Sequence, residues 1–66
     1  MKLAPREREV LYWVVQGLTN KQIAQLLGIT HSTVQTYVRD IMRVYNVNSR
    51  VLLVLAALKE MKQEQQ

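Results

Sequence analysis

The sequence has no cysteine and only one histidine, His31. Without thiols the chain can form neither a disulfide framework nor a thiolate metal site. One imidazole and no convergent cluster of carboxylates also leave no nucleophilic dyad. We therefore expect no enzyme activity, no metal and no cofactor, and we expect His31 to be a solvated residue in the first turn of a helix.

Long apolar runs are missing as well. The chain begins with the segment MKLAPRERE, which becomes charged too early to hold the apolar region of a signal peptide. No apolar run approaches the roughly 18 residues that a membrane-spanning helix needs. We expect a cytoplasmic protein that has no membrane partner.

Proline occurs once and glycine twice, and all three lie where helices are expected to begin or end. Pro5 suits the first position of a helix, whereas Gly17 and Gly28 can adopt the left-handed conformation that ends one. Between them, apolar residues recur at helical spacing. The pattern predicts an all-α fold of four helices, with the boundaries Pro5 to Gly17, Thr19 to Gly28, Thr30 to about Tyr45, and Ser49 to the region of Lys62.

What is present is a globular composition with an excess of positive charge. Hydrophobic residues make up 48% of the 66 residues, and nine Lys and Arg against five Asp and Glu give a formal charge of +4. A chain of this length forms one domain, here residues 1–66, with residues 62–66 expected to fray. The charge favours a polyanionic partner, although charge alone does not separate nucleic-acid binding from other roles.

The second and third predicted helices are joined by a very short turn. Ala24 allows the two helices to approach closely, and Gly28 permits the backbone conformation of the turn. Ile29 and Val34 can fill the angle between the helices. These features predict a helix-turn-helix, a motif that places its second helix in the major groove of DNA.

The third predicted helix has an apolar side and a polar side, because successive residues are rotated by about 100°. The apolar side holds Val34, Val38, Ile41 and Tyr45, and the polar side holds Ser32, Gln35, Thr36, Arg39 and Arg43. Gln can address an adenine edge, Arg a guanine edge, and a Thr methyl a thymine methyl, while Ser32 and Thr33 could bond phosphates. A polar face with a few arginines is common on surface helices. The tight preceding turn is what favours DNA binding.

The fourth predicted helix is apolar on every side, since the residues from Val51 to Leu58 are apolar without interruption. In so small a domain such a helix implies a second contact surface, and a symmetric dimer is the usual solution. Candidates for the dimer contact are Val54, Leu58 and Met61. The alternatives are docking onto a sensory domain and burial within the domain's own core.

Several segments together resemble one known family. They are LAPREREVL at residues 3–11, GLTNKQIA at 17–24, LGI at 27–29, STVQ at 32–35, IM at 41–42 and VNSR at 47–50. The resemblance is to the C-terminal DNA-binding domain of LuxR/FixJ-type, or GerE-like, bacterial transcription regulators, and it ends around Ala57. It implies a four-helix domain in which helix three is the recognition helix, helix four is the dimerisation helix, and the function is transcription regulation.

The resemblance also implies roles for individual residues. Those similar to the base-facing positions of the family are Gln35, Thr36 and Arg39, and the candidates for backbone contact are Thr19, Asn20, Lys21, Ser32, Thr33, Tyr37 and Arg43. The family commonly has Lys in place of Gln35, His in place of Tyr37, and a capping Ser or Thr in place of Ala4. Glu9 and Arg50 match charged positions, and we predict that they pair, with a solvated charge as the alternative.

We therefore predict a sequence-specific double-stranded DNA binder that reads a pseudo-palindromic operator as a homodimer. Met1 is compatible with a stand-alone regulator and with the effector domain of a longer chain. A rival hypothesis is an interaction module that forms a heterodimer with a larger regulator of this type and inhibits it. Region four of sigma factors shares the helix-turn-helix, but the Val47 to Arg50 segment and the apolar helix after it favour the regulator family.

Overall fold

The structure, a computed structural model, describes residues 2–64. Within that range every regular element is an α-helix, as the sequence predicts. The helices are α1 (Pro5–Val15), α2 (Asn20–Leu27), α3 (His31–Val44) and α4 (Arg50–Glu64). All four begin and end within about two residues of the predicted boundaries, except that α4 continues through Glu64, past the start of the predicted frayed tail. Residues 65–66 of that tail lie outside the described range.

Side-chain caps explain where α2 and α3 begin. The Thr19 hydroxyl accepts a hydrogen bond from the Gln22 N–H (3.1 Å), and the Gln22 side-chain oxygen accepts one from the Thr19 N–H (2.8 Å). The Thr30 hydroxyl accepts from the Thr33 N–H at 3.1 Å. These bonds satisfy backbone donors that a helix leaves unpaired in its first turn. Thr19 and Thr30 therefore cap the helices at the boundaries that the sequence predicts.

Helix α1 begins with only one of the two hydrogen bonds that α2 has at its N-terminus. Its cap residue is Ala4, which has no side-chain acceptor, although the Glu7 carboxylate accepts from the Ala4 N–H at 2.9 Å. Helix α4 does have a side-chain cap, because the Ser49 hydroxyl accepts from the Leu52 N–H at 3.1 Å. Of the four helices, α1 therefore has the weakest N-terminal cap.

The turn of the helix-turn-helix depends on Gly28. This residue has φ = +69°, and its N–H donates to the Ala24 carbonyl at the end of α2. A side chain would disfavour that left-handed conformation, which glycine adopts freely. Only Ile29 and Thr30 then separate Gly28 from the first residue of α3. The predicted tight turn is confirmed.

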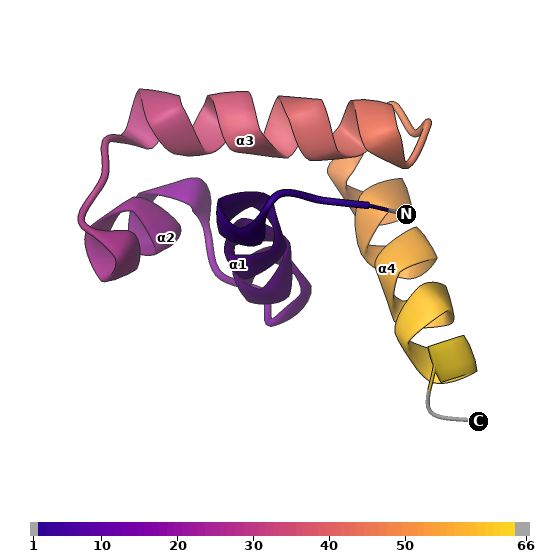
Figure 1. The fold of residues 1–66 in the computed structure, drawn as a ribbon. Helices are drawn as coiled ribbons and strands as arrows, with labels where there is room; N and C mark the ends of the chain where they lie inside the picture. Colours follow the sequence, from indigo (N-terminus) through magenta and orange to yellow (C-terminus); the bar gives the residue numbers. More distant parts are fainter. Residues whose placement is uncertain (1, 65–66) are drawn as a thin grey trace.

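Helix α1 lies at the centre of the domain and contacts each of the other three helices. Figure 1 shows α3 running across α1 and α2, while α4 descends from the far end of α3 and its distal part extends away from the body. The recognition helix predicted from the sequence thus rests on the other helices along one side only. Its other side remains open.

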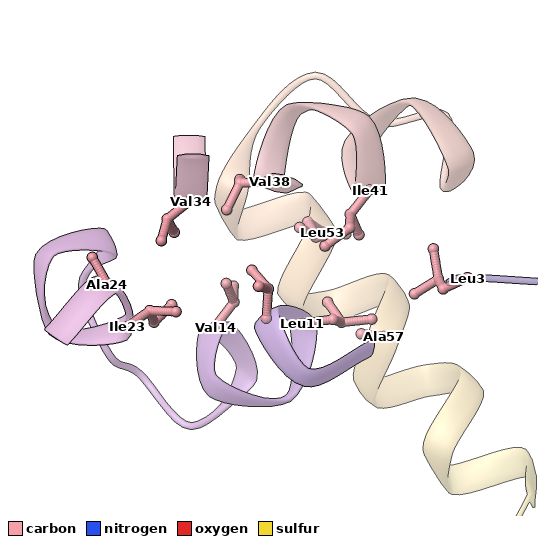
Figure 2. Packing of buried hydrophobic residues seen from close by; sticks show 11 residues of the cluster. Leu3, Leu11, Val14, Ile23, Ala24, Val34, Val38, Ile41, Leu53 and Ala57 are labelled. Carbon is pink, nitrogen blue, oxygen red and sulfur yellow. The ribbon is translucent and has the colours of Figure 1, made fainter. Parts of the chain in front are cut away.

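The core is small and entirely apolar, and Figure 2 shows its side chains meeting between the helices. The buried residues are Leu3, Val10, Leu11, Val14, Ile23, Ala24, Val34, Val38, Ile41, Leu53 and Ala57. Three of them come from the predicted apolar side of α3. Trp13 and Tyr45 are half-buried and pack against this cluster, and the Tyr45 hydroxyl donates to the Glu60 carboxylate at 2.7 Å. Among the described residues, no helix combines the length and apolar character needed to span a membrane.

Candidate nucleic-acid interface

The open side of α3 carries the polar residues that the sequence places there. All five of them are exposed, namely Ser32, Gln35, Thr36, Arg39 and Arg43. The residues on the opposite side of α3, about half a turn around the helix from these polar residues, include Val34 and Ile41, which are fully buried. The exposed polar residues and the buried core residues of α3 therefore lie on different sides of the helix.

Part of that face forms one wall of a surface hollow of about 410 Å³, which we call the α3 hollow. Its lining residues are Asn20, Gln35, Val38, Arg39, Met42, Arg43 and Val47. The hollow thus brings together two predicted base-reading residues, Gln35 and Arg39, with two predicted backbone-contacting residues, Asn20 and Arg43. Residues separated by more than 20 positions in the sequence meet here because α2 begins beside α3.

Asp40 lies between the two arginines of this face, and sequence reasoning missed it. Its Oδ1 is 3.8 Å from Nε of Arg39 and 3.9 Å from Nη1 of Arg43. Both guanidinium groups remain largely exposed, with 62% and 74% of the side chain accessible. Such solvated pairs are weak, so the arginines stay available to another anion. The three-residue spacing from Asp40 to Arg43 is the signal that could have revealed this cluster.

The hydroxyl groups near the start of α3 are partly engaged within the helix. The Thr36 hydroxyl donates to the Ser32 carbonyl at 3.2 Å, which leaves its oxygen able to accept a hydrogen bond and its methyl group able to contact a base. The Thr33 and Thr30 hydroxyls lie 2.8 Å apart and share a hydrogen bond. Tyr37 is half-buried and packs against the core, so it is less accessible than the exposed contact residues Lys21 and Ser32.

The start of α2 supplies a second group of polar residues. Lys21 is exposed. The Thr19 hydroxyl accepts from the helix backbone, which leaves its own hydrogen able to donate to an anion. Asn20 is half-buried and its side-chain oxygen accepts from Nη1 of Arg50 at 2.5 Å.

The predicted pairing of Glu9 with Arg50 is wrong. Glu9 lies 3.5 Å from Arg6 on the exposed side of α1. Arg50 instead donates from Nη2 to the Leu18 carbonyl at 2.8 Å, in addition to its bond with Asn20. The guanidinium binds the backbone carbonyl in the loop after α1, because a partly buried acceptor without a partner is costly whereas exposed Glu9 is solvated.

A separate apolar surface runs along α4. Its exposed residues are Val51, Leu52, Leu55 and Leu58. Of the predicted dimer residues, Leu58 is exposed, whereas Val54 and Met61 are half-buried. Beside this surface lies an apolar groove of about 310 Å³, lined by Val14, Gly17, Leu18, Arg50, Val51, Val54 and Leu55.

A comparison with known families decides the identity. The family described as "Bacterial regulatory proteins, luxR family" matches residues 1–57. The chain belongs to the LuxR family. The resemblance predicted from the sequence motifs is thereby confirmed.

Several response and transcriptional regulators are similar to this chain over most of its length. The nitrate/nitrite response regulator protein NarP of Escherichia coli is 43% identical over 58 residues, which cover 88% of this chain and 27% of NarP. The two-component response regulator PprB of Pseudomonas aeruginosa is 47% identical over 55 residues, covering 83% and 20% respectively. The probable transcriptional regulator ycf29 of Porphyra purpurea is 40% identical over 57 residues, covering 86% and 27%. The chain spans about a quarter of the length of these relatives.

Membership of the LuxR family places this helix-turn-helix domain among bacterial regulatory proteins. His31 is an exposed residue in the first turn of α3, as predicted. In the part of the chain that the structure describes, no three His, Cys, Asp or Glu residues gather closely enough to hold a metal ion.

Proposed function

We propose that this LuxR-family domain binds double-stranded DNA sequence-specifically, with α3 in the major groove of a pseudo-palindromic operator. The observation that carries the proposal is the α3 hollow, where Gln35 and Arg39 lie beside Asn20 and Arg43. Exposed amide and guanidinium groups on one helix face are suited to base edges. Cations and amide donors beside them are suited to phosphates. A single surface thus offers both kinds of contact.

Each predicted contact residue has a role in this proposal. Gln35, Thr36 and Arg39 read bases, while the groups at the start of α2 and along the rest of α3 contact the DNA backbone. Lys21 is the strongest phosphate ligand, because it is exposed and lies in the first turn of α2, where the helix dipole also favours an anion. The other backbone contacts are Thr19, Asn20, Ser32, Thr33, Tyr37 and Arg43.

The same proposal includes a homodimer formed through α4. Val51, Leu55 and Leu58 follow a spacing of four and three residues, so they form one exposed apolar stripe, which Val54 and Met61 flank. A second copy would remove that stripe from water. Two recognition helices related by a twofold axis would then read half-sites roughly 34–36 Å apart, which is one turn of DNA.

Fluorescence anisotropy tests the proposed DNA binding. It is measured with a random duplex and with a duplex from a selected-site pool, each at two salt concentrations. We expect Arg39→Ala to weaken the selected duplex by about 1–3 kcal/mol and the random duplex much less. We expect Lys21→Ala to weaken both equally and to reduce the salt dependence by about one phosphate contact. Arg8→Ala, which removes an exposed charge from α1, is the matched control. Equal losses on both duplexes for Arg39→Ala would contradict its base-reading role.

A second candidate function rests on the exposed apolar stripe of α4. The chain could pair through that stripe with a larger LuxR-type regulator and block it. Both this function and operator reading fit the cytoplasmic location that we propose. Sedimentation of the chain alone and with a full-length regulator separates the two candidates. Absence of DNA binding at low salt together with heterodimer formation would favour the inhibitor. Salt-sensitive binding to a palindrome would favour the operator reader.

A further inference from the structure

Arg50 is a charged residue for which DNA reading and dimerisation, as proposed above, leave no role. It is the first residue of α4, yet its side chain reaches back to the loop before α2. Nη1 donates to Oδ1 of Asn20 at 2.5 Å, and Nη2 donates to the Leu18 carbonyl at 2.8 Å. One guanidinium therefore joins three segments: the loop after α1, the start of α2 and the start of α4.

The chemistry of that contact determines which way the Asn20 amide points. A guanidinium has five N–H donors and no acceptor, so only the oxygen of the amide can face it. The NH₂ group of Asn20 must then lie on the side away from Arg50. The orientation of an Asn amide is usually ambiguous, but here the partner removes the ambiguity.

Asn20 also lines the α3 hollow, together with Arg39 and Arg43. Phosphate oxygens accept hydrogen bonds and do not donate them, so a side chain beside DNA must present its donor end. An Asn with the opposite orientation would bring its carbonyl oxygen towards the phosphate and be repelled. The Arg50 contact excludes that orientation before DNA arrives.

We infer that Arg50 is a positioning residue that holds Asn20 with its amide donors available to a DNA phosphate. Its second bond, to the Leu18 carbonyl, fixes the loop from which α2 begins, so the guanidinium fork sets both the place and the orientation of Asn20. The inference rests on the proposed DNA binding and adds to it a residue that touches no DNA.

Asn20→Asp tests the orientation of the amide. The aspartate keeps an oxygen for Arg50 but replaces the NH₂ group with a second oxygen. We expect the melting temperature to stay the same or rise, and the affinity for random duplex to fall by about ten-fold or more. The matched control is Gln25→Glu, which makes the same charge change at an exposed position of α2, about 140° around the helix from Asn20. Asn20→Asp binding as tightly as this control, while the unmodified chain binds, would overturn the inference.

Arg50→Lys tests the positioning role, because it keeps the charge but loses the two-pronged geometry. We expect a loss of several-fold in DNA affinity in the presence of Asn20, and no further loss when Asn20→Ala is already in place. Equal losses in the two backgrounds would show a merely structural effect and overturn the inference, as would an unchanged affinity in Asn20→Ala alone. Failure of the unmodified chain to bind any duplex would instead overturn the proposed function itself.

Discussion

The incomplete cap of α1 gives a prediction about stability that does not depend on DNA binding. Ala4 already has the extended backbone of a helix cap, with φ = −64° and ψ = 155°. Glu7 already supplies the returning half of a capping box at 2.9 Å. What is missing is a side-chain oxygen at position 4, which Ala4→Thr or Ala4→Ser would supply at an exposed site.

The size of the gain follows from the other helices of the same chain. The hydroxyls of Thr19 and Thr30 each accept a backbone N–H at 3.1 Å, and such a bond is worth about 1 kcal/mol relative to Ala. Because α1 contacts every other helix, the gain should appear in the global free energy of unfolding. For a domain of this length it corresponds to a rise of about 4–8 °C in melting temperature.

Thermal and urea unfolding followed by far-ultraviolet circular dichroism measures this effect. The urea m-value should not change, because the substitution leaves the surface exposed on unfolding nearly the same. Thr30→Ala is the control in the opposite direction, since it removes an existing cap and lowers stability by about 1 kcal/mol. If Thr30→Ala lowers the melting temperature while Ala4→Thr leaves it unchanged, the reasoning about α1 is refuted.

Three further predictions concern the turn, the interface and α4. Gly28→Ala should lower the free energy of unfolding by about 1–2 kcal/mol in urea unfolding, because alanine disfavours the left-handed backbone and no other atom lies within 4 Å of the added Cβ. An unchanged free energy of unfolding would contradict the role of φ = +69°. Asp40→Asn should raise the affinity for random duplex a few-fold in anisotropy measurements, by removing a carboxylate between two exposed arginines, and it should do so more than Glu9→Gln on α1. Leu55→Asp, at a side chain that is 57% exposed, should abolish self-association in sedimentation without unfolding the domain; an unchanged sedimentation coefficient would refute the α4 dimer.

Local signals were sufficient to predict the helices and the polar face of α3. Thr19 and Thr30 cap helices through bonds to residues three positions away, so their role can be derived from adjacent sequence. The alternation of Val34 and Val38 with Gln35 and Arg39 has the helical period, which determines the buried side. Both kinds of signal act within one or two turns of helix.

Two other features could not be derived in this way. The partner of Arg50 lies 30 positions earlier, at Asn20, and several acceptors within reach of the same long side chain compete for it. In α4 the apolar run has no period, so the sequence does not distinguish the buried Leu53 from Val51, which is 69% exposed. Only packing of α4 against the rest of the domain makes that distinction.

The separation between the two sides of α3 has a consequence for how such domains diversify. Gln35, Thr36 and Arg39 are exposed and none belongs to the buried cluster, so their replacement should cost little folding free energy. If these residues read bases as proposed, a new operator preference would arise by single substitutions on a constant scaffold, with no compensating change in the core. The same separation makes α3 a practical target for engineering regulators whose binding sites do not overlap.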